Sequence, residues 1–306
     1  MSAVAVAEAY VPRRSLLRLG ARRFAHRPVA LAALLVLLAL LAVGAAAPVL
    51  VGGGADEIDL AHVKNAPSLA HLFGTDNIGR DVLKRTVWGI RTSAEVALAA
   101  AGLATLVGVV AGVVAGWFGG WLDAVVIRLA DLVTAYPAVV FTLAAFVYFR
   151  PVYPHTLILV FASFMWAMVA RAVRADVVRL REAEFVEAAR ALGASNARII
   201  VRHLVPNTLG TIVVAATSLV GLVVLVDATV EFFGFGVPEA VQPSLGNLVA
   251  DTVKFQFGLA ANSDVAAVNY GWWTWFFPGL VLVVILVTVN LVGDALDEAL
   301  NPARSR

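Results

Sequence analysis

Long uninterrupted apolar runs constrain this chain more than any other feature of its sequence. Several runs reach the length of about 20 residues that a helix needs to cross a bilayer. Backbone polar groups in lipid must be paired within the protein, so only helices and closed barrels span a membrane. The apolar residues here are continuous and do not alternate with polar ones, as barrel strands would require. The sequence therefore predicts an all-α integral membrane protein.

Composition supports this class and excludes several others. Hydrophobic residues make up 61% of the 306 residues and charged residues 14%, against roughly 45–50% and about 25% in soluble domains. The net charge of +2 gives no reason to expect a nucleic-acid partner. Because the sequence has no cysteine, it can form no disulfide, no cysteine-bound metal centre and no thiol nucleophile. No histidines stand at metal-ligand spacing, so neither a metal site nor a catalytic site is expected.

Six membrane spans are predicted from the apolar runs, and they divide the chain into five parts. The spans cover residues 29–51, 94–117, 122–148, 156–173, 209–232 and 275–296. The parts are a segment 1–28, a transmembrane anchor 29–51, an external linker 52–93, a transmembrane domain 94–297 and a tail 298–306. Within the third span, Tyr136-Pro137 predicts a kink, because proline removes a backbone hydrogen bond.

The distribution of lysine and arginine predicts the orientation in the membrane. Arginines cluster before the first span, between spans four and five, and after span six, so both termini are expected in the cytoplasm. The loop 234–274 is then external, and its tryptophans near span six are expected at the headgroups. Five basic residues of the linker oppose this orientation mildly: Lys64, Arg80, Lys84, Arg85 and Arg91.

The segment 171–207, between spans four and five, is too polar to cross a membrane but is rich in helix-forming residues. Gly193 can end a first helix from the C′ position, and Ser195 can cap a short second helix. Pro206 is expected to stop the run before span five. By itself this pattern predicts a solvated connector of two short helices.

Small and charged residues inside the spans predict two further features. Gly108, Gly112 and Gly116 line one face of span two and let another helix approach closely, from this chain or from a partner. Asp227 and Glu231 lie four residues apart on span five, where a carboxylate is costly to bury. They are either positions of a transport pathway that face a partner, or charges at a helix end that reach the interface.

Glu187-Ala188-Ala189, followed by Gly193 and Pro206, resembles the cytoplasmic EAA loop of ATP-binding-cassette (ABC) importer permeases. His203 and Val205 stand where the general pattern has Ile and Leu, but His-x-x-Pro-Asn at 203–207 is similar to the dipeptide, oligopeptide and nickel branch. The anchor before these matches resembles the second, C-type subunit of such importers, and the stretch 260–270 is extra length. Three further stretches are similar to that branch: 71–83, with its GTDxxGRD-like motif, 231–238 with Gly246-Asn247, and 277–279 with 290–302.

The resemblance implies a type I permease fold of six transmembrane helices, with a cytoplasmic coupling helix between spans four and five. It implies a heterodimer with a homologous permease subunit in the bacterial cytoplasmic membrane, two cytoplasmic ATPase subunits, and an external substrate-binding protein. ATP and Mg would bind the ATPases and this chain would hold no cofactor, since it lacks a GxxxxGK[ST] phosphate loop. The implied ATPase-coupling residues are Glu187, Ala188, Ala189, Arg190, Gly193 and Pro206.

Di- or oligopeptides are the substrates that the resemblance implies, and nickel chelates or other small solutes stay open as alternatives. An ion-coupled secondary transporter is the main competing function, although the sequence shows no repeat halves of the kind common in such proteins. Its candidate proton-carrying carboxylates would be Glu95 and Asp227. A structural membrane protein would need no ATPase partner, and a membrane enzyme would need a nucleophile–base pair that the sequence does not offer.

Overall fold

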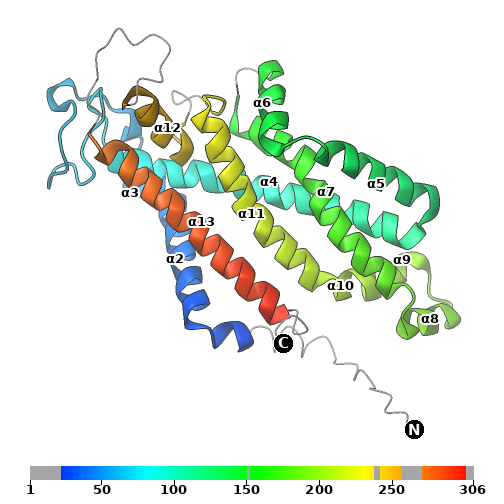
Figure 1. The fold of residues 1–306 in the computed structure, drawn as a ribbon. Coiled ribbons are helices and arrows are strands. Elements are labelled where there is room, and N and C mark those ends of the chain that lie inside the picture. The colour runs from blue at the N-terminus through cyan, green and yellow to red at the C-terminus, as the bar shows by residue number, and fades with distance from the viewer. Residues whose placement is uncertain (1–21, 150–151, 238–241, 257–270, 301–306) are drawn as a thin grey trace, which may run out of the picture.

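The computed structural model describes residues 22–149, 152–237, 242–256 and 271–300. Five long helices form its body (Figure 1): α2 (Pro28–Ala45), α4 (Val82–Phe118), α7 (Pro154–Leu180), α11 (Leu209–Phe232) and α13 (Trp273–Leu300). Each is long and apolar enough to cross a membrane, and a bent pair of helices reaches the same length and hydropathy when the two are taken together. No strand occurs in these residues. The predicted all-α membrane class is therefore confirmed.

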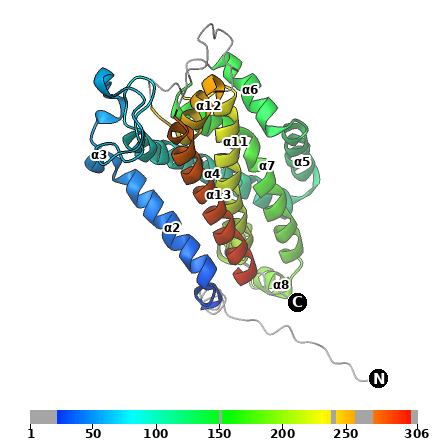
Figure 2. The same cartoon turned by 60° about the vertical axis from the view of Figure 1, so that its left-hand side comes forward.

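Shorter helices connect the long ones. They are α3 (Ala47–Leu50), α5 (Gly120–Thr134), α6 (Ala138–Tyr148), α8 (Glu184–Ala191), α9 (Asn196–Ile199), α10 (Val205–Asn207) and α12 (Leu245–Gln256). The start of α2, the end of α13 and α8 lie at one end of the bundle, which we call the α8 end, while α3 and α12 lie at the opposite, α12 end (Figures 1 and 2). An ion pair between Arg27 and Glu298 joins the start of α2 to the end of α13.

The structure corrects the predicted bounds of spans two and four. Helix α4 begins at Val82, inside the predicted linker 52–93, because the Asp81 carboxylate accepts a hydrogen bond from the Lys84 N–H (3.1 Å) and caps the helix. Its 37 residues reach about 55 Å, well beyond the apolar thickness of a bilayer. Helix α7 likewise continues to Leu180, so the first part of the predicted connector 171–207 belongs to a span.

The third predicted span is broken and not merely kinked. Helices α5 and α6 meet at an angle of 84°, with the break at Tyr136-Pro137. Proline at this point has no N–H to give to the preceding turn, and its ring excludes the carbonyl that would have accepted it. The location of the break was predicted correctly from the sequence, but its size was not.

Basic residues that opposed the predicted orientation form ion pairs with three acidic neighbours. Asp76 pairs with Arg80 (2.6 Å) and Arg85 (3.2 Å). Two further pairs complete this set: Lys84 with Glu57 (3.4 Å) and Arg91 with Glu95 (3.0 Å). Acidic residues count for little in the rule that relates lysine and arginine to orientation, so these pairs leave the mild conflict with the arginine clusters in place.

The segment before α4 is fixed to α13 by aromatic contacts. The Trp273 indole N–H donates to the Thr75 carbonyl (3.1 Å), and the rings of Phe73 and Phe277 stack with their centroids 4.2 Å apart. Trp273 was expected at the lipid headgroups, but its polar atom is used within the protein. The GTDxxGRD-like motif is therefore a structural element that attaches the linker to the bundle.

Gly79 should not tolerate a side chain. Its φ is +86°, and a Cβ atom added there would lie 1.8 Å from the Asp59 carbonyl oxygen. We expect Gly79→Ala to lower the thermal stability of the purified protein, because both backbone strain and a steric clash oppose the native turn. Gly53→Ala is the matched control, since no atom lies within 4 Å of the added carbon there. Equal melting temperatures for the two variants would contradict this explanation.

The predicted external loop 234–274 contains helix α12, which was not predicted from the sequence. Pro243 was expected to break any helix, but it precedes α12, where proline is tolerated. Ser244 and Asn247 cap α12 reciprocally: Asn247 N–H donates to Ser244 Oγ (3.2 Å), and Ser244 N–H donates to Asn247 Oδ1 (3.0 Å). Pro238, the extra stretch 260–270, residues 1–21 and the end of the tail lie outside the described residues.

Candidate functional site

The connector between α7 and α11 forms an arm at the α8 end of the bundle (Figure 1). After α7, a turn at residues 181–183 reverses the chain into α8, and α9 then leads back toward α11. The sequence predicted two short helices with a break at Gly193, and these are α8 and α9. The turn that separates α8 from α7 was not predicted, because strong helix formers continue through it.

Helix α8 ends in a complete Schellman motif. Gly193 has φ +79°, its N–H donates to the Arg190 carbonyl (2.9 Å), and the Ala194 N–H donates to the Ala189 carbonyl (3.0 Å). These are the two bonds that define the motif, with Gly193 in the C′ position. The Ser195 side chain then accepts from the Arg198 N–H (3.4 Å) and caps α9. The arm thus has a definite shape set by its own sequence.

The inner face of α8 is attached to the bundle. Val186 is fully buried in the hydrophobic core, and the Arg190 guanidinium lies over the Trp117 ring, 4.8 Å from its centroid. Next to this contact, Arg181 donates to the Gly116 carbonyl at the end of α4 (3.2 Å). The contact of Arg190 with Trp117 therefore joins α8 directly to the end of α4, and that of Arg181 joins the turn before α8 to the same place. For Arg190, predicted as an ATPase-coupling residue, the structure shows this contact within the chain.

The outer face of α8 is open to a partner. Glu187 and Ala188 are exposed, and Ala189 is half-buried. Leu192 projects at the tip with 89% of its surface exposed. Two acidic residues in the first turn, Glu184 and Glu187, suit the positive end of the helix dipole. Small side chains beside an acidic group and an exposed leucine form a surface that fits close docking of another protein.

Pro206 does not stop the helix, contrary to the prediction. Residues Ile200–Leu204 form a π-helical turn, and the Val205 N–H donates to the Ile200 carbonyl five residues back. The widened turn accommodates the ring of Pro206, which would otherwise clash with the preceding turn. Helix α10 follows and reaches α11 through Thr208. The return from the arm into the membrane is therefore almost continuously helical, which suits the transmission of movement.

The glycine face of α4 packs against α7 of the same chain. A Cβ atom at Gly108 would lie 2.6 Å from the Trp166 carbonyl oxygen, and one at Gly112 would lie 2.6 Å from that of Ala170. At Gly116 the added atom would lie 2.9 Å from the Val177 side chain. The sequence left open whether the neighbour belongs to this chain, and the structure places α7 there.

Asp227 and Glu231 are buried inside this chain. Only 4% of Asp227 and 2% of Glu231 is exposed, so Glu231 does not reach the interface as a helix-end charge, and neither side chain lies on the surface of the subunit. Glu231 packs at the start of α12: a Cβ atom at Gly246 would lie 2.1 Å from its Oε2. The positive end of the α12 dipole favours a carboxylate at that point. Glu231 thus lies between α11 and the first turn of α12.

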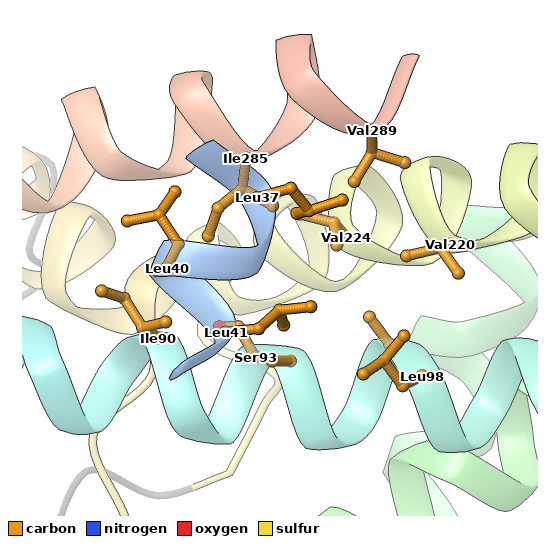
Figure 3. Close-up of a pocket in the computed structure, with 12 residues that line it drawn as sticks. Leu37, Leu40, Leu41, Ile90, Ser93, Leu98, Val220, Val224, Ile285 and Val289 are labelled. Atoms are coloured by element: carbon orange, nitrogen blue, oxygen red, sulfur yellow. The ribbon is translucent and has the colours of Figure 1, made fainter. Parts of the chain in front are cut away.

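A small apolar pocket of about 50 Å³ lies between α2, α4, α11 and α13 (Figure 3). Leu37 and Leu40 line it from α2, and Ile285 lines it from α13. The one polar side chain in the lining, Ser93, already accepts a hydrogen bond from the Leu245 N–H (3.3 Å). Such a pocket offers nothing to orient a polar substrate. In the described ranges, no three His, Asp or Glu side chains are grouped to hold a metal ion.

Comparison with known proteins identifies related sequences over almost the whole chain. The family described as "Binding-protein-dependent transport system inner membrane component" matches residues 108–306, which include the arm. A protein of Brucella suis biovar 1 named as a peptide permease is 35% identical over 284 residues, 92% of this chain and 90% of its own length. The dipeptide transport system permease protein DppC of Alkalihalophilus pseudofirmus is 32% identical over 274 residues, 90% of this chain and 86% of its own length.

Proposed function

The chain belongs to the family of binding-protein-dependent transport system inner membrane components, and on that premise we propose that it is a membrane-spanning subunit of an ABC importer for di- or oligopeptides. The observation that carries this proposal is the arm: α8 has its inner face attached to α4 and its outer face, with Glu187 and Ala188, open. The relatives named as peptide and dipeptide permeases support the substrate class.

The arm is the part of this chain that the ATPase subunits would contact and move. Two ATPase subunits would bind ATP and Mg, and one would dock on the outer face of α8. Closure of the ATPase pair would displace α8, and the contacts of Arg190 with Trp117 and of Arg181 with Gly116 would carry the displacement to α4. The helical return through α10 would carry it to α11. This chain itself would perform no catalysis.

The assembly and its orientation follow from the same proposal. A homologous permease subunit would complete the transport path as a heterodimer, and a substrate-binding protein outside the membrane would deliver the peptide to the α12 end. The α8 end would lie in the cytoplasm of the bacterium, as would both termini. The arginines of the arm and of the start of α2 support this orientation.

Uptake assays with reconstituted protein distinguish this proposal from an ion-coupled transporter. We expect proteoliposomes that hold the assembled complex to accumulate a radiolabelled dipeptide only when ATP is supplied to the ATPase subunits. A protonophore should leave the initial rate unchanged. Uptake without ATP that collapses with the protonophore would contradict the proposal and favour ion coupling.

A further inference from the structure

The chain enters its first span through an exposed, cationic turn of helix, which we call the arginine turn (residues 22–26). Its two arginines, Arg22 and Arg23, are both exposed. The His26 Nδ1–H donates to the Arg22 carbonyl (2.6 Å) and closes the turn. Arg27 is then extended, with φ −105° and ψ 97°, before α2 begins. The arginine turn and α2 therefore run in different directions, as Figure 2 shows at the foot of α2.

The first span fixes the depth of the arginine turn in the membrane. Helix α2 has 18 residues and no polar side chain. At 1.5 Å per residue it is about 27 Å long, close to the roughly 30 Å of the hydrocarbon core. Arg27 immediately precedes this apolar helix. The arginine turn therefore lies at the level of the lipid phosphates, outside the hydrocarbon.

The positive charge of the arginine turn is available to a ligand. Among the residues that the structure describes, no carboxylate pairs with Arg22 or Arg23, whereas Arg27 pairs with Glu298 at the end of α13. The sequence before α2 contains six arginines and one acidic residue, Glu8. An arginine cluster directly on the cytoplasmic side of a span is typical of proteins that bind anionic lipids.

The surface of α2 above the arginine turn is open to lipid. Only 17% of this span is buried against the rest of the protein, and its exposed residues next to the turn, Val29 and Leu31, are apolar. Figure 2 shows α2 at the edge of the bundle, on the opposite side from α5 and α6. Lipids beside α2 therefore bring their phosphate groups to the level of Arg22 and Arg23. The planar guanidinium fork matches the oxygens of a phosphate.

We propose that the arginine turn is a binding site for anionic phospholipids, with Arg22 and Arg23 on the phosphate groups and α2 against the acyl chains. The site goes beyond the proposed transport function, and only its assignment to the cytoplasmic leaflet rests on the proposed orientation. Because Arg27 pairs with Glu298, a lipid bound at the turn would also hold the end of α13 at the membrane surface. Both the first and the last span would then be positioned by the charge of the leaflet.

Fluorescence quenching at a single cysteine measures which lipid lies beside the arginine turn, because the natural chain contains no cysteine. Val29→Cys, on the first turn of α2, carries the fluorophore, and Leu50→Cys carries it at the other end of the span as a control; both positions are exposed. The complete importer is reconstituted into vesicles that contain phosphatidylglycerol and phosphatidylcholine, and one of the two lipids is spin-labelled near its headgroup. We expect quenching at residue 29 to show a preference of roughly 5-fold for the anionic phosphatidylglycerol. At residue 50 the two lipids should quench about equally.

Charge variants decide whether the arginines cause the preference at residue 29. Arg22→Gln and Arg23→Gln, made together, should abolish it, whereas Arg22→Lys and Arg23→Lys should keep most of it because the charge remains. Arg179→Gln is the matched control, since this arginine on α7 is 73% exposed at the same end of the bundle, and it should change nothing. Salt should weaken the preference, because the Debye length falls from about 10 Å at 0.1 M to about 3 Å at 1 M.

Two results would overturn the lipid site: equal quenching by the two lipids at residue 29, or a preference that the double glutamine variant retains. Displacement of the labelled phosphatidylglycerol by inorganic phosphate would also overturn it, because the turn would then be a site for free phosphate. Each of these readouts is independent of peptide uptake, so failure of the lipid site leaves the proposed transport function untouched.

Discussion

Gly112→Ala is expected to destabilise the protein strongly, whereas Gly102→Ala on the same helix should not. The added carbon at Gly112 would lie 2.6 Å from the Ala170 carbonyl oxygen. This is a backbone atom of α7, so it cannot move away by a side-chain rotation. Helices α4 and α7 also cannot separate locally, because Gly108 and Gly116 hold them equally close on either side. Overpacking of this kind costs roughly 1–3 kcal/mol or more.

The measurement is the thermal unfolding midpoint of the purified variants in mild detergent, together with their yield from membranes. We expect the midpoint of Gly112→Ala to fall by roughly 5 °C or more. At Gly102 an added carbon meets no atom within 4 Å, so that variant should match the natural protein. A Gly112→Ala protein as stable as the Gly102→Ala control would show that α4 and α7 do not pack as described.

Gly193→Asp is expected to abolish peptide uptake while the protein remains folded in the membrane. Gly193 has φ +79°, which strains any side chain, but no atom lies within 4 Å of an added Cβ. Apart from this backbone strain, the effect of the new side chain would fall on what docks at the arm. Asp also places a negative charge beside the exposed Leu192, within the surface proposed to meet the ATPase. The loss should appear in uptake and in ATPase binding, while the unfolding midpoint should fall about as far as that of Gly193→Asn, which places a side chain in the same backbone conformation.

Gly193→Asn is the matched control, because asparagine has nearly the shape of aspartate, is uncharged and readily adopts positive φ. We expect this variant to retain a measurable part of the uptake that Gly193→Asp loses. Full uptake by Gly193→Asp in reconstituted vesicles would refute the role of the arm in coupling. Loss of membrane insertion would instead assign Gly193 a purely structural role.

Local sequence signals predicted part of this molecule well. The apolar run 209–232 matches α11 at both ends, because its helical residues are uninterrupted. Gly193 and Ser195 indicated the end of α8 and the start of α9, since each acts through bonds to its own neighbours. The four-residue spacing of glycines indicated a close helix contact for the same local reason.

Features that depend on tertiary contacts could not be predicted from local sequence signals. The extension of α4 to Val82 relies on its cap Asp81, which also contacts His71 (2.9 Å) in the segment before α4. The burial of Glu231 depends on α12. This helix follows Pro243 in the sequence and was not predicted. The size of the break after Thr134 follows from how α5 and α6 pack, which local propensity does not encode.

Purification of the tagged chain in mild detergent, with its partners identified and their ATPase activity measured, tests the importer function most directly. We expect a second permease subunit and an ATPase to co-purify with the natural chain. We also expect Glu187→Arg, which reverses an exposed charge on α8, to release the ATPase and leave the membrane partner bound. A chain that purifies alone and still transports peptide, or an ATPase held equally well by Glu187→Arg and Gly193→Asp, would refute the importer function.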